Sequence, residues 1–251
     1  MKLKELLDEV QKVADIIQCS SPMLCGGASR DKYMGNLKKI ADLDITNGDK
    51  SILKLSSALA EELSKKYSLS RQEMSDGHSS IHIGNMKLDF SSNFNAPNID
   101  KLLVLRGIKN PTELQKEMFS RDFSCNALLL SMDLKTVLDP TLSGFDSIKR
   151  KLIKTCLDPK ITLTNNRNRV SRAIYLACKL GFDLDQSIID FVSKNPQSIK
   201  ISTPKSLKEK MEQAFEHDAD KAAFYLNKMN LWNFIEITEK IYPYFLKNKA
   251  Q

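Results

Sequence analysis

Two aspartates one residue apart, Asp42 and Asp44, are the residues of this sequence best suited to chemistry. They lie in the apolar stretch ADLDIT, which is typical of a β-strand, and alternate residues of a strand point to the same face of a sheet. Two carboxylates placed this closely repel each other unless a cation lies between them. Mg²⁺ binds through carboxylate and phosphate oxygens, so the pair predicts a divalent metal site.

A third carboxylate, Asp89, lies in the stretch MKLDF. The alternation of apolar residues in this stretch predicts a strand with Asp89 on the polar face. If this strand neighbours the first, Asp89 completes a triad with Asp42 and Asp44. Two metal ions held by such a triad can activate an attacking hydroxyl and stabilise a leaving pyrophosphate.

A glycine pair precedes the aspartates. Gly26 and Gly27 allow the backbone to approach a phosphate closely, and the N-terminus of the helix that follows favours an anion. Arg30 adds a charge-assisted contact for a triphosphate. Each feature alone is common in turns or on solvated strand edges. Their order along the chain is more specific, because it places phosphate-binding and metal-binding groups together.

The elements that must position these residues alternate between helix and strand in the first part of the chain. A hairpin is expected around Gly84-Asn85 in SSIHIGNMKLDFSS. We also expect helices at residues 3–18, 30–34 and 50–67 and beginning near Pro111, and strands at 23–25 and in ADLDIT.

Strand signals stop after about residue 147. The segments that read as helices there are KRKLIKTC, NRVSRAIYLACKLGF, LDQSIIDFVSKN, SLKEKMEQAFE, DKAAFYLNKMN and LWNFIEITEKIY. The sequence therefore predicts an α+β fold. A head domain at residues 1–146, with a small mixed sheet flanked by helices, is followed by an all-α domain at residues 147–251.

The positive charge is concentrated in the second part. Residues 1–146 hold 19 Lys/Arg against 20 Asp/Glu, and residues 147–251 hold 19 against 11. Such asymmetry indicates an acidic partner for the second part, and nucleic acid is the natural candidate. A set of lysine-rich helices that merely solvate their own surfaces would give the same composition.

Other features of the sequence bear on location. The 5 cysteines are widely spread without a CxxC pair, which favours reduced thiols and a cytoplasmic protein. The apolar runs fall short of the roughly 20 residues that cross a bilayer, so we expect no membrane association. The first residues read as an amphipathic helix rather than a targeting signal. The oligomeric state stays open.

The motifs resemble those of one family. LCGGASRDKYMG with ADLDIT is similar to the GGxxRD and DxD signature of class II tRNA nucleotidyltransferases (CCA-adding enzymes) and bacterial poly(A) polymerases. MFSRDFSCNALLLSMD, LDPTLSGFDSIKRKLIKT and NNRNRVSRAIYLACKLGF resemble further motifs of that family, in the same order. The resemblance extends over nearly the whole chain and covers the family's nucleotidyltransferase head and helical neck, without its body and tail.

The resemblance implies a role for each matching residue. Asp42 and Asp44 would hold the catalytic Mg²⁺ ions, and Asp89 would be the third catalytic carboxylate. The implied nucleotide-binding residues are Gly26, Gly27 and Arg30 for the triphosphate, Arg121, Asp122 and Asn126 for the ribose, and Asn166, Arg169 and Arg172 on the neck. Arg169 and Arg172 are three apart, so on a helix they share a face.

The resemblance implies a template-independent RNA nucleotidyltransferase. It would add C, A or both to the 3′ end of a tRNA from CTP and ATP and release pyrophosphate. Asn165 and Asn166 replace the family's acidic pair, and an amide donates as well as accepts hydrogen bonds, so the choice of base stays open. The alternatives are a poly(A) polymerase, a partial CC- or A-adding enzyme, a nucleotidyltransferase acting on a protein or small molecule, or a silent RNA-binding module.

Overall fold

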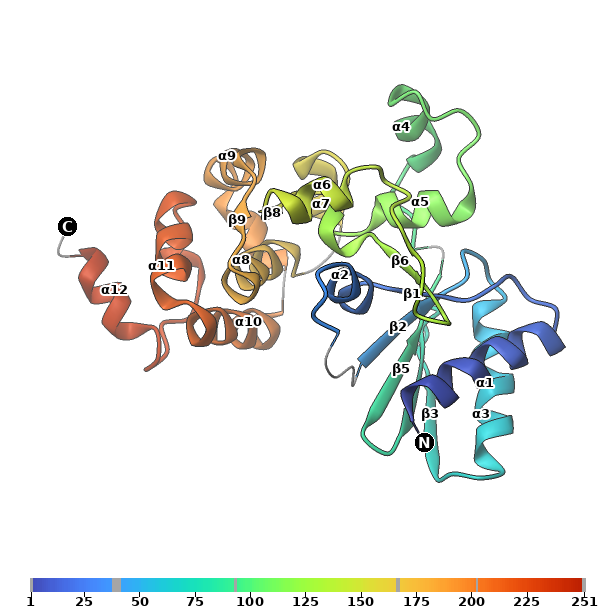
Figure 1. Ribbon diagram of the computed structural model, residues 1–251. Helices are drawn as coiled ribbons and strands as arrows, with labels where there is room; N and C mark the ends of the chain where they lie inside the picture. Colours follow the sequence, from blue (N-terminus) through green and yellow to red (C-terminus); the bar gives the residue numbers. More distant parts are fainter. Residues whose placement is uncertain (1, 38–41, 93, 166–167, 202, 250–251) are drawn as a thin grey trace. The chain divides into compact units, whose positions relative to one another are not determined.

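A computed structural model describes residues 2–37, 42–92, 94–165, 168–201 and 203–249. Contacts within the chain define two compact units (Figure 1). Unit 1 comprises Met1–Ser120 and Asn126–Gly144, and unit 2 comprises Arg121–Cys125 and Phe145–Gln251. The predicted domain boundary between residues 146 and 147 stays a prediction.

Unit 1 is built on a mixed sheet. The spatial order of its strands is β3 (Leu69–Glu73), β4 (Ser79–Ile83), β5 (Met86–Phe90), β2 (Asp42–Thr46), β1 (Met23–Cys25), β6 (Leu129–Ser131) and β7 (Val137–Leu138). The neighbours β2 and β5 run parallel, whereas the other neighbouring pairs are antiparallel. The parallel pair is the junction that brings two polar strand faces together.

Helices α1 (Leu3–Ile16) and α3 (Ile52–Ser64) pack against each other and beside this sheet (Figure 1). In α1 the buried residues recur at helical spacing, as Leu6, Leu7, Val10, Val13 and Ala14, so one face is apolar. Their core partners on the sheet are Leu24, Leu43, Ile45, Ile81, Ile83, Leu88, Phe90 and Leu130. Residues that alternate with these on each strand face away from the core.

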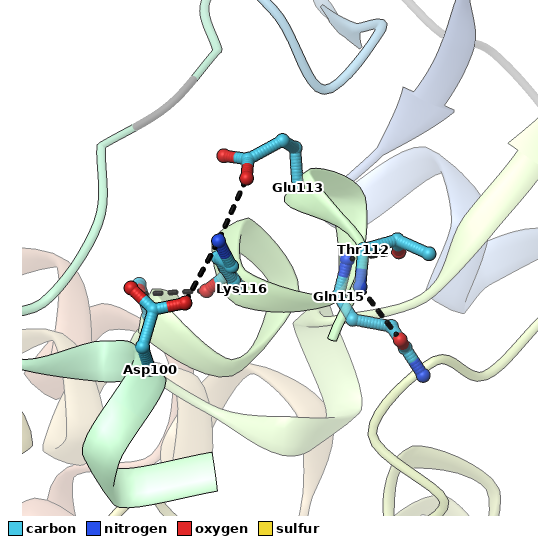
Figure 2. A network of polar contacts seen from close by, with 6 residues as sticks. Asp100, Thr112, Glu113, Gln115 and Lys116 are labelled. Carbon is cyan, nitrogen blue, oxygen red and sulfur yellow. Dashed lines mark hydrogen bonds and ion pairs between the residues drawn. The ribbon is translucent and has the colours of Figure 1, made fainter. Parts of the chain in front are cut away.

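Helix α2 (Gly27–Tyr33) contacts strands β1, β2, β6 and β7, and a 3₁₀ turn, η1, covers Ser124–Asn126. The segment beyond β5 forms α4 (Ile99–Leu105) and α5 (Glu113–Ser120). Figure 2 shows how the two helices are joined: the Lys116 ammonium pairs with Asp100 at 2.8 Å and Glu113 at 2.7 Å. These ion pairs raise the pKa of Lys116.

The start of α5 is fixed by a reciprocal pair of hydrogen bonds, also visible in Figure 2. The Gln115 amide N–H donates to Thr112 Oγ1 at 3.1 Å, and the Thr112 amide N–H donates to Gln115 Oε1 at 3.0 Å. This is a capping box, which satisfies two backbone donors that a helix start leaves without partners. The network therefore fixes the course of the chain shortly before residue 121.

Unit 2 is mainly helical. Its elements are α6 (Gly144–Lys149), β8 (Leu152–Ile153), α7 (Pro159–Asn165), α8 (Arg169–Leu180), β9 (Asp183–Leu184), α9 (Gln186–Lys194), η2 (Pro196–Ile201), α10 (Pro204–His217), α11 (Ala219–Lys228), η3 (Trp232–Phe234) and α12 (Tyr242–Lys249). Helix α8 packs against α10 and α11, and β8 pairs in parallel with β9. The Tyr225 hydroxyl accepts a hydrogen bond from the Leu184 amide at 2.8 Å, which ties α11 to β9.

The α+β class predicted from the sequence is confirmed, with a mixed sheet followed by helices. Two helix predictions are wrong. In KRKLIKTC, Lys151 takes a φ of +52° and the next two residues form β8, because they pair with β9. In LWNFIEITEKIY only η3 and the final residue, Tyr242 at the start of α12, are helical, and Ile235 is extended in a stretch rich in β-branched residues. In the described ranges, no helix is long and apolar enough to cross a membrane.

Candidate functional site

The aspartates of ADLDIT lie on the face of β2 that points away from the core. Asp42 and Asp44 are exposed, whereas Leu43 and Ile45 between and beyond them are fully buried against α1 and α3. The alternation expected from the sequence is therefore present, and it places the two carboxylates side by side. Because β2 lies within the sheet, both side chains are presented on a supported surface rather than on a loop.

The third carboxylate lies on the neighbouring strand. Asp89 of β5 is the register partner of Asp44, and the two strands are parallel, so both side chains share one face of the sheet. Asp89 accepts a hydrogen bond from the Ser80 hydroxyl and pairs with the Lys87 ammonium at 2.6 Å. The structure thus brings the three predicted carboxylates onto two adjacent strands.

Gly26 shapes the space beside Asp44. Its backbone has φ +72° and ψ −135°, a conformation that residues with a side chain adopt only with strain. A Cβ at this position would lie 2.5 Å from Asp44 Oδ2. Only glycine therefore fits here without moving the carboxylate. Gly27 begins α2 and has more room, since a Cβ there would lie 3.6 Å from the Arg30 guanidinium.

Arg30 is buried, and its guanidinium joins two of the predicted motifs. Its Nη1 donates to Asn126 Oδ1 at 2.6 Å, and its Nε donates to Asp31 at 2.8 Å. Asn126 is also buried. The arginine predicted to bind a triphosphate thus holds the side chain of the asparagine predicted to read the ribose, so it has a positioning function in this structure.

A second cluster lies in unit 2, around Asp122. This buried carboxylate accepts from Arg172 Nε at 2.7 Å and from the Phe123 amide at 2.8 Å. Burial acts to raise the pKa of Asp122, but the charges of Arg172 and Arg169 outweigh it and hold the pKa below its ordinary value. Asp122 is therefore ionised and orients Arg172.

Arg169 lies beside this ion pair on the same helix. Its Nη1 donates to the Thr162 carbonyl at 3.0 Å, which fixes the side chain against α7. Burial lowers the pKa of Arg169, and Asp122 opposes this effect, whereas the nearby Arg172 and Arg121 charges add to it. Two guanidinium groups, those of Arg169 and Arg172, thus act on the Asp122 carboxylate, and the Arg121 charge lies near Arg169. This excess of positive charge suits an anion. Asn166, the residue predicted to contact the base, lies outside the described residues.

Sequence reasoning missed the partners of Asp89, although the signals were present. Lys87 precedes Asp89 by two residues, so on a strand it shares the same face. Ser80 follows from the predicted hairpin, because a turn at Gly84-Asn85 places Ser80 opposite Asp89. These residues show that the third carboxylate is held by a cation and a hydroxyl of the protein itself.

The donor chemistry fits a hard cation at Asp42 and Asp44, because both supply exposed carboxylate oxygens on one face. Asp89 is turned toward Ser80 and Lys87 instead. Across the described residues, no group of three His, Cys, Asp or Glu side chains converges as a ready metal site. The two aspartates of β2 therefore offer the oxygen donors that a hard cation prefers, and Asp89 would have to release Ser80 and Lys87 to join them.

Comparison with known proteins matches the first part of the chain to a domain family. Residues 23–154 match the poly A polymerase head domain. The tRNA nucleotidyltransferase cca2 of Schizosaccharomyces pombe is 22% identical over 236 residues, which cover 85% of this chain and 48% of that protein. The A-adding tRNA nucleotidyltransferase of Aquifex aeolicus is 26% identical over 172 residues, 65% of this chain and 19% of that protein.

Solved structures share the fold. The Bacillus stearothermophilus CCA-adding enzyme, solved in complex with CTP, superposes with a TM-score of 0.70 at 17% identity. The match covers 98% of this chain and 57% of that one. The chain thus spans about half the length of the yeast relative and about a fifth of the Aquifex one. The residues that match the poly A polymerase head domain make up more than half of this chain. The chain therefore belongs to the family of that domain.

Proposed function

We propose that this chain is a metal-dependent, template-independent RNA nucleotidyltransferase. The 3′ hydroxyl of an RNA gives up its proton to water and attacks the α-phosphate of a nucleoside triphosphate in line. The bond from this phosphorus to the bridging oxygen breaks, and pyrophosphate leaves. The observation that carries the proposal is the shared sheet face of Asp42, Asp44 and Asp89, with glycine backbone against Asp44. Membership of the head-domain family supports it.

In this proposal Asp42 and Asp44 hold Mg²⁺, which when bound would lower the pKa of the attacking hydroxyl and offset charge on the phosphates. Gly26 keeps the Asp44 carboxylate in place, because no side chain competes for its space. Asp89 is the third catalytic carboxylate, with Lys87 as its counter-ion before substrate binds. Catalysis then rests mainly on positioning and electrostatics.

The nucleotide would be held by two sets of groups. The backbone of Gly26 and Gly27 and the Arg30 side chain belong to the proposed triphosphate subsite, in which Arg30 also holds Asn126. In unit 2, Arg121, Asp122, Asn166, Arg169 and Arg172 belong to the proposed ribose and base subsites. The ion pair between Asp122 and Arg172 supports this proposal, because it fixes the guanidinium plane that would face a nucleotide.

The proposed acceptor is the 3′ end of a tRNA, with CTP and ATP as the nucleotides. This follows the names of the relatives, of which the yeast protein is a tRNA nucleotidyltransferase and the Aquifex one is A-adding. The positive charge of residues 147–251 supports RNA as the partner. All five cysteines lie in the described residues and form no disulfide there, in keeping with the proposed cytoplasmic location.

The test is an extension assay with purified protein, Mg²⁺, and each nucleoside triphosphate supplied separately. The acceptors are tRNA transcripts lacking CCA, ending in C or ending in CC, and an unrelated oligonucleotide. Addition that stops at CCA, at CC or after a single A identifies the reaction within the proposed class. Long A tails on every RNA would replace it with poly(A) synthesis. Failure of every RNA and nucleotide pair, by a folded protein that still binds nucleotide, would refute RNA as the acceptor.

A further inference from the structure

Helix α8 exposes a single stripe to solvent. Its buried residues are Val170, Ser171, Ala173, Ile174, Leu176, Ala177 and Cys178. The partly or fully exposed residues include Arg169, Arg172, Tyr175 and Lys179. They recur at intervals of three or four, so they follow one face of the helix. The helix contains no acidic residue, and this face is therefore made of cations and one aromatic ring.

A second helix adds to this face. Helix α10 packs against α8, and Figure 1 shows the two next to each other in unit 2. The Lys210 ammonium of α10 lies 4.4 Å from the centroid of the Tyr175 ring, and the Lys179 ammonium lies 5.4 Å from the same centroid. The His217 ring lies 5.7 Å away. Both lysines are within cation–π distance of one ring, which holds the two ammonium groups near each other.

The charge of these two lysines is not balanced locally. Within the ranges that the structure describes, neither Lys179 nor Lys210 forms an ion pair with a carboxylate, and Lys210 instead donates to the Gln213 amide oxygen at 2.9 Å. By contrast, Lys208 and Lys240 in the same unit are paired with glutamates. Two like charges kept together without a counter-ion form a site for an anion of more than one charge.

Resting on the proposed function, we propose that Lys179 and Lys210, held together by the Tyr175 ring, bind the phosphate backbone of the single-stranded 3′ end of the acceptor RNA. We call these three residues the lysine–tyrosine surface. It continues, along the same face of α8, the arginines assigned to the nucleotide. An RNA strand whose 3′ end lies next to the nucleotide held by Arg169 and Arg172 therefore continues along this helix. Cations interleaved with an aromatic ring are the usual means of holding single-stranded nucleic acid.

The test compares two double variants of equal charge. The first variant combines Lys179→Gln with Lys210→Gln and removes both cations of the lysine–tyrosine surface. The control combines Lys208→Gln with Lys240→Gln and removes two lysines of the same unit that already pair with glutamates. The probe is a fluorescent 12-nucleotide single-stranded RNA ending in CC, titrated by anisotropy between 0.05 and 0.3 M KCl. Losing two phosphate contacts should reduce the slope of log K against log [salt] by about 1.4, and affinity at 0.1 M by roughly 25-fold. The control should keep the wild-type slope.

Tyr175 gives a second, independent variant. Tyr175→Ala removes the ring and should weaken RNA binding by roughly tenfold, whereas Tyr175→Phe keeps the ring and should restore it. Binding of CTP and ATP in the absence of RNA is measured in parallel, and neither Tyr175 variant should change it. Thermal unfolding of each variant shows that the fold persists. Equal binding by Tyr175→Ala and wild type would overturn the role of the ring.

The outcomes separate this proposal from the function on which it rests. If wild type extends RNA and the surface variant binds RNA with the same slope as the control, the lysine–tyrosine surface is refuted and the function stands. If wild type binds but never extends RNA, the function is refuted, while a reduced slope in the surface variant still supports the surface. If wild type binds no single-stranded RNA at any salt concentration, the surface is overturned directly.

Discussion

Replacing Gly26 by alanine tests whether the Asp44 carboxylate must stay where the structure places it. The new Cβ would lie 2.5 Å from Asp44 Oδ2, nearly 1 Å inside an ordinary contact of about 3.4 Å. A carboxylate can rotate away at little cost in free energy. The cost in stability therefore comes mainly from the backbone at φ +72° and ψ −135°, about 1–3 kcal/mol. Such a loss is smaller than the stability of an ordinary domain.

The effect on activity should be larger. A displacement of about 1 Å in a catalytic group costs on the order of 100-fold in rate, so single-turnover nucleotide addition by Gly26→Ala should fall by roughly that factor. Gly35→Ala is a matched control, because Gly35 has a φ of +73° and a Cβ there would meet nothing within 4 Å. The control should lose stability and keep its rate. Equal rates for the two folded variants would refute the argument that Gly26 protects the position of Asp44.

Three further substitutions test the contacts within each unit. Arg172→Gln should cost about 1–2 kcal/mol of unfolding free energy, less than a fully buried pair, because the Arg172 side chain is 43% exposed. The folded-state pKa of Asp122 is lowered, so the difference in unfolding free energy between wild type and Arg172→Gln should be complete above the ordinary pKa of 3.8. It should vanish as pH falls through the lowered pKa. A difference that persists in acid would contradict an ion pair between Arg172 and ionised Asp122. Asn126→Ala should cost about 1–3 kcal/mol in urea unfolding, because the buried Arg30 donor loses its acceptor, whereas Asn126→Asp should not. Burial raises the pKa of the Tyr225 phenol to about 12, so Tyr225→Phe should remove one high-pH step from a titration followed by ultraviolet absorbance. An unchanged titration would show that Tyr225 does not produce that step.

The local parts of the site could be predicted from the sequence. The alternation in ADLDIT places Leu43 and Ile45 in the core and the two aspartates opposite, because a strand has a period of two. The Gly84-Asn85 turn likewise sets the β4–β5 register. Both results depend only on residues close together in the chain, where backbone geometry leaves few alternatives.

The long-range parts could not be predicted in this way. The register of β2 against β5 joins strands separated by α3, β3 and β4, and several registers fit the same apolar pattern. The pairing of Arg30 with Asn126 spans 96 positions. Helix α4 was missed: its N-cap, Asn98, has a φ of +59° and makes no side-chain capping hydrogen bond, so the usual signal of a helix start does not operate there. Tertiary contacts decide these features, and the sequence alone shows only which residues are available.

We propose that Asp42 and Asp44 form the catalytic metal site of an RNA nucleotidyltransferase. The most direct measurement is the rate of nucleotide addition to a tRNA acceptor by Asp42→Asn and Asp44→Asn, over a titration of Mg²⁺, with Asp8→Asn as the control on an exposed face of α1. Binding of the RNA and thermal unfolding are measured alongside. Both variants should lose nucleotide addition while they keep their fold and their RNA binding, and the control should add nucleotide at the normal rate. Wild-type rates in either variant, at any Mg²⁺ concentration, would contradict it.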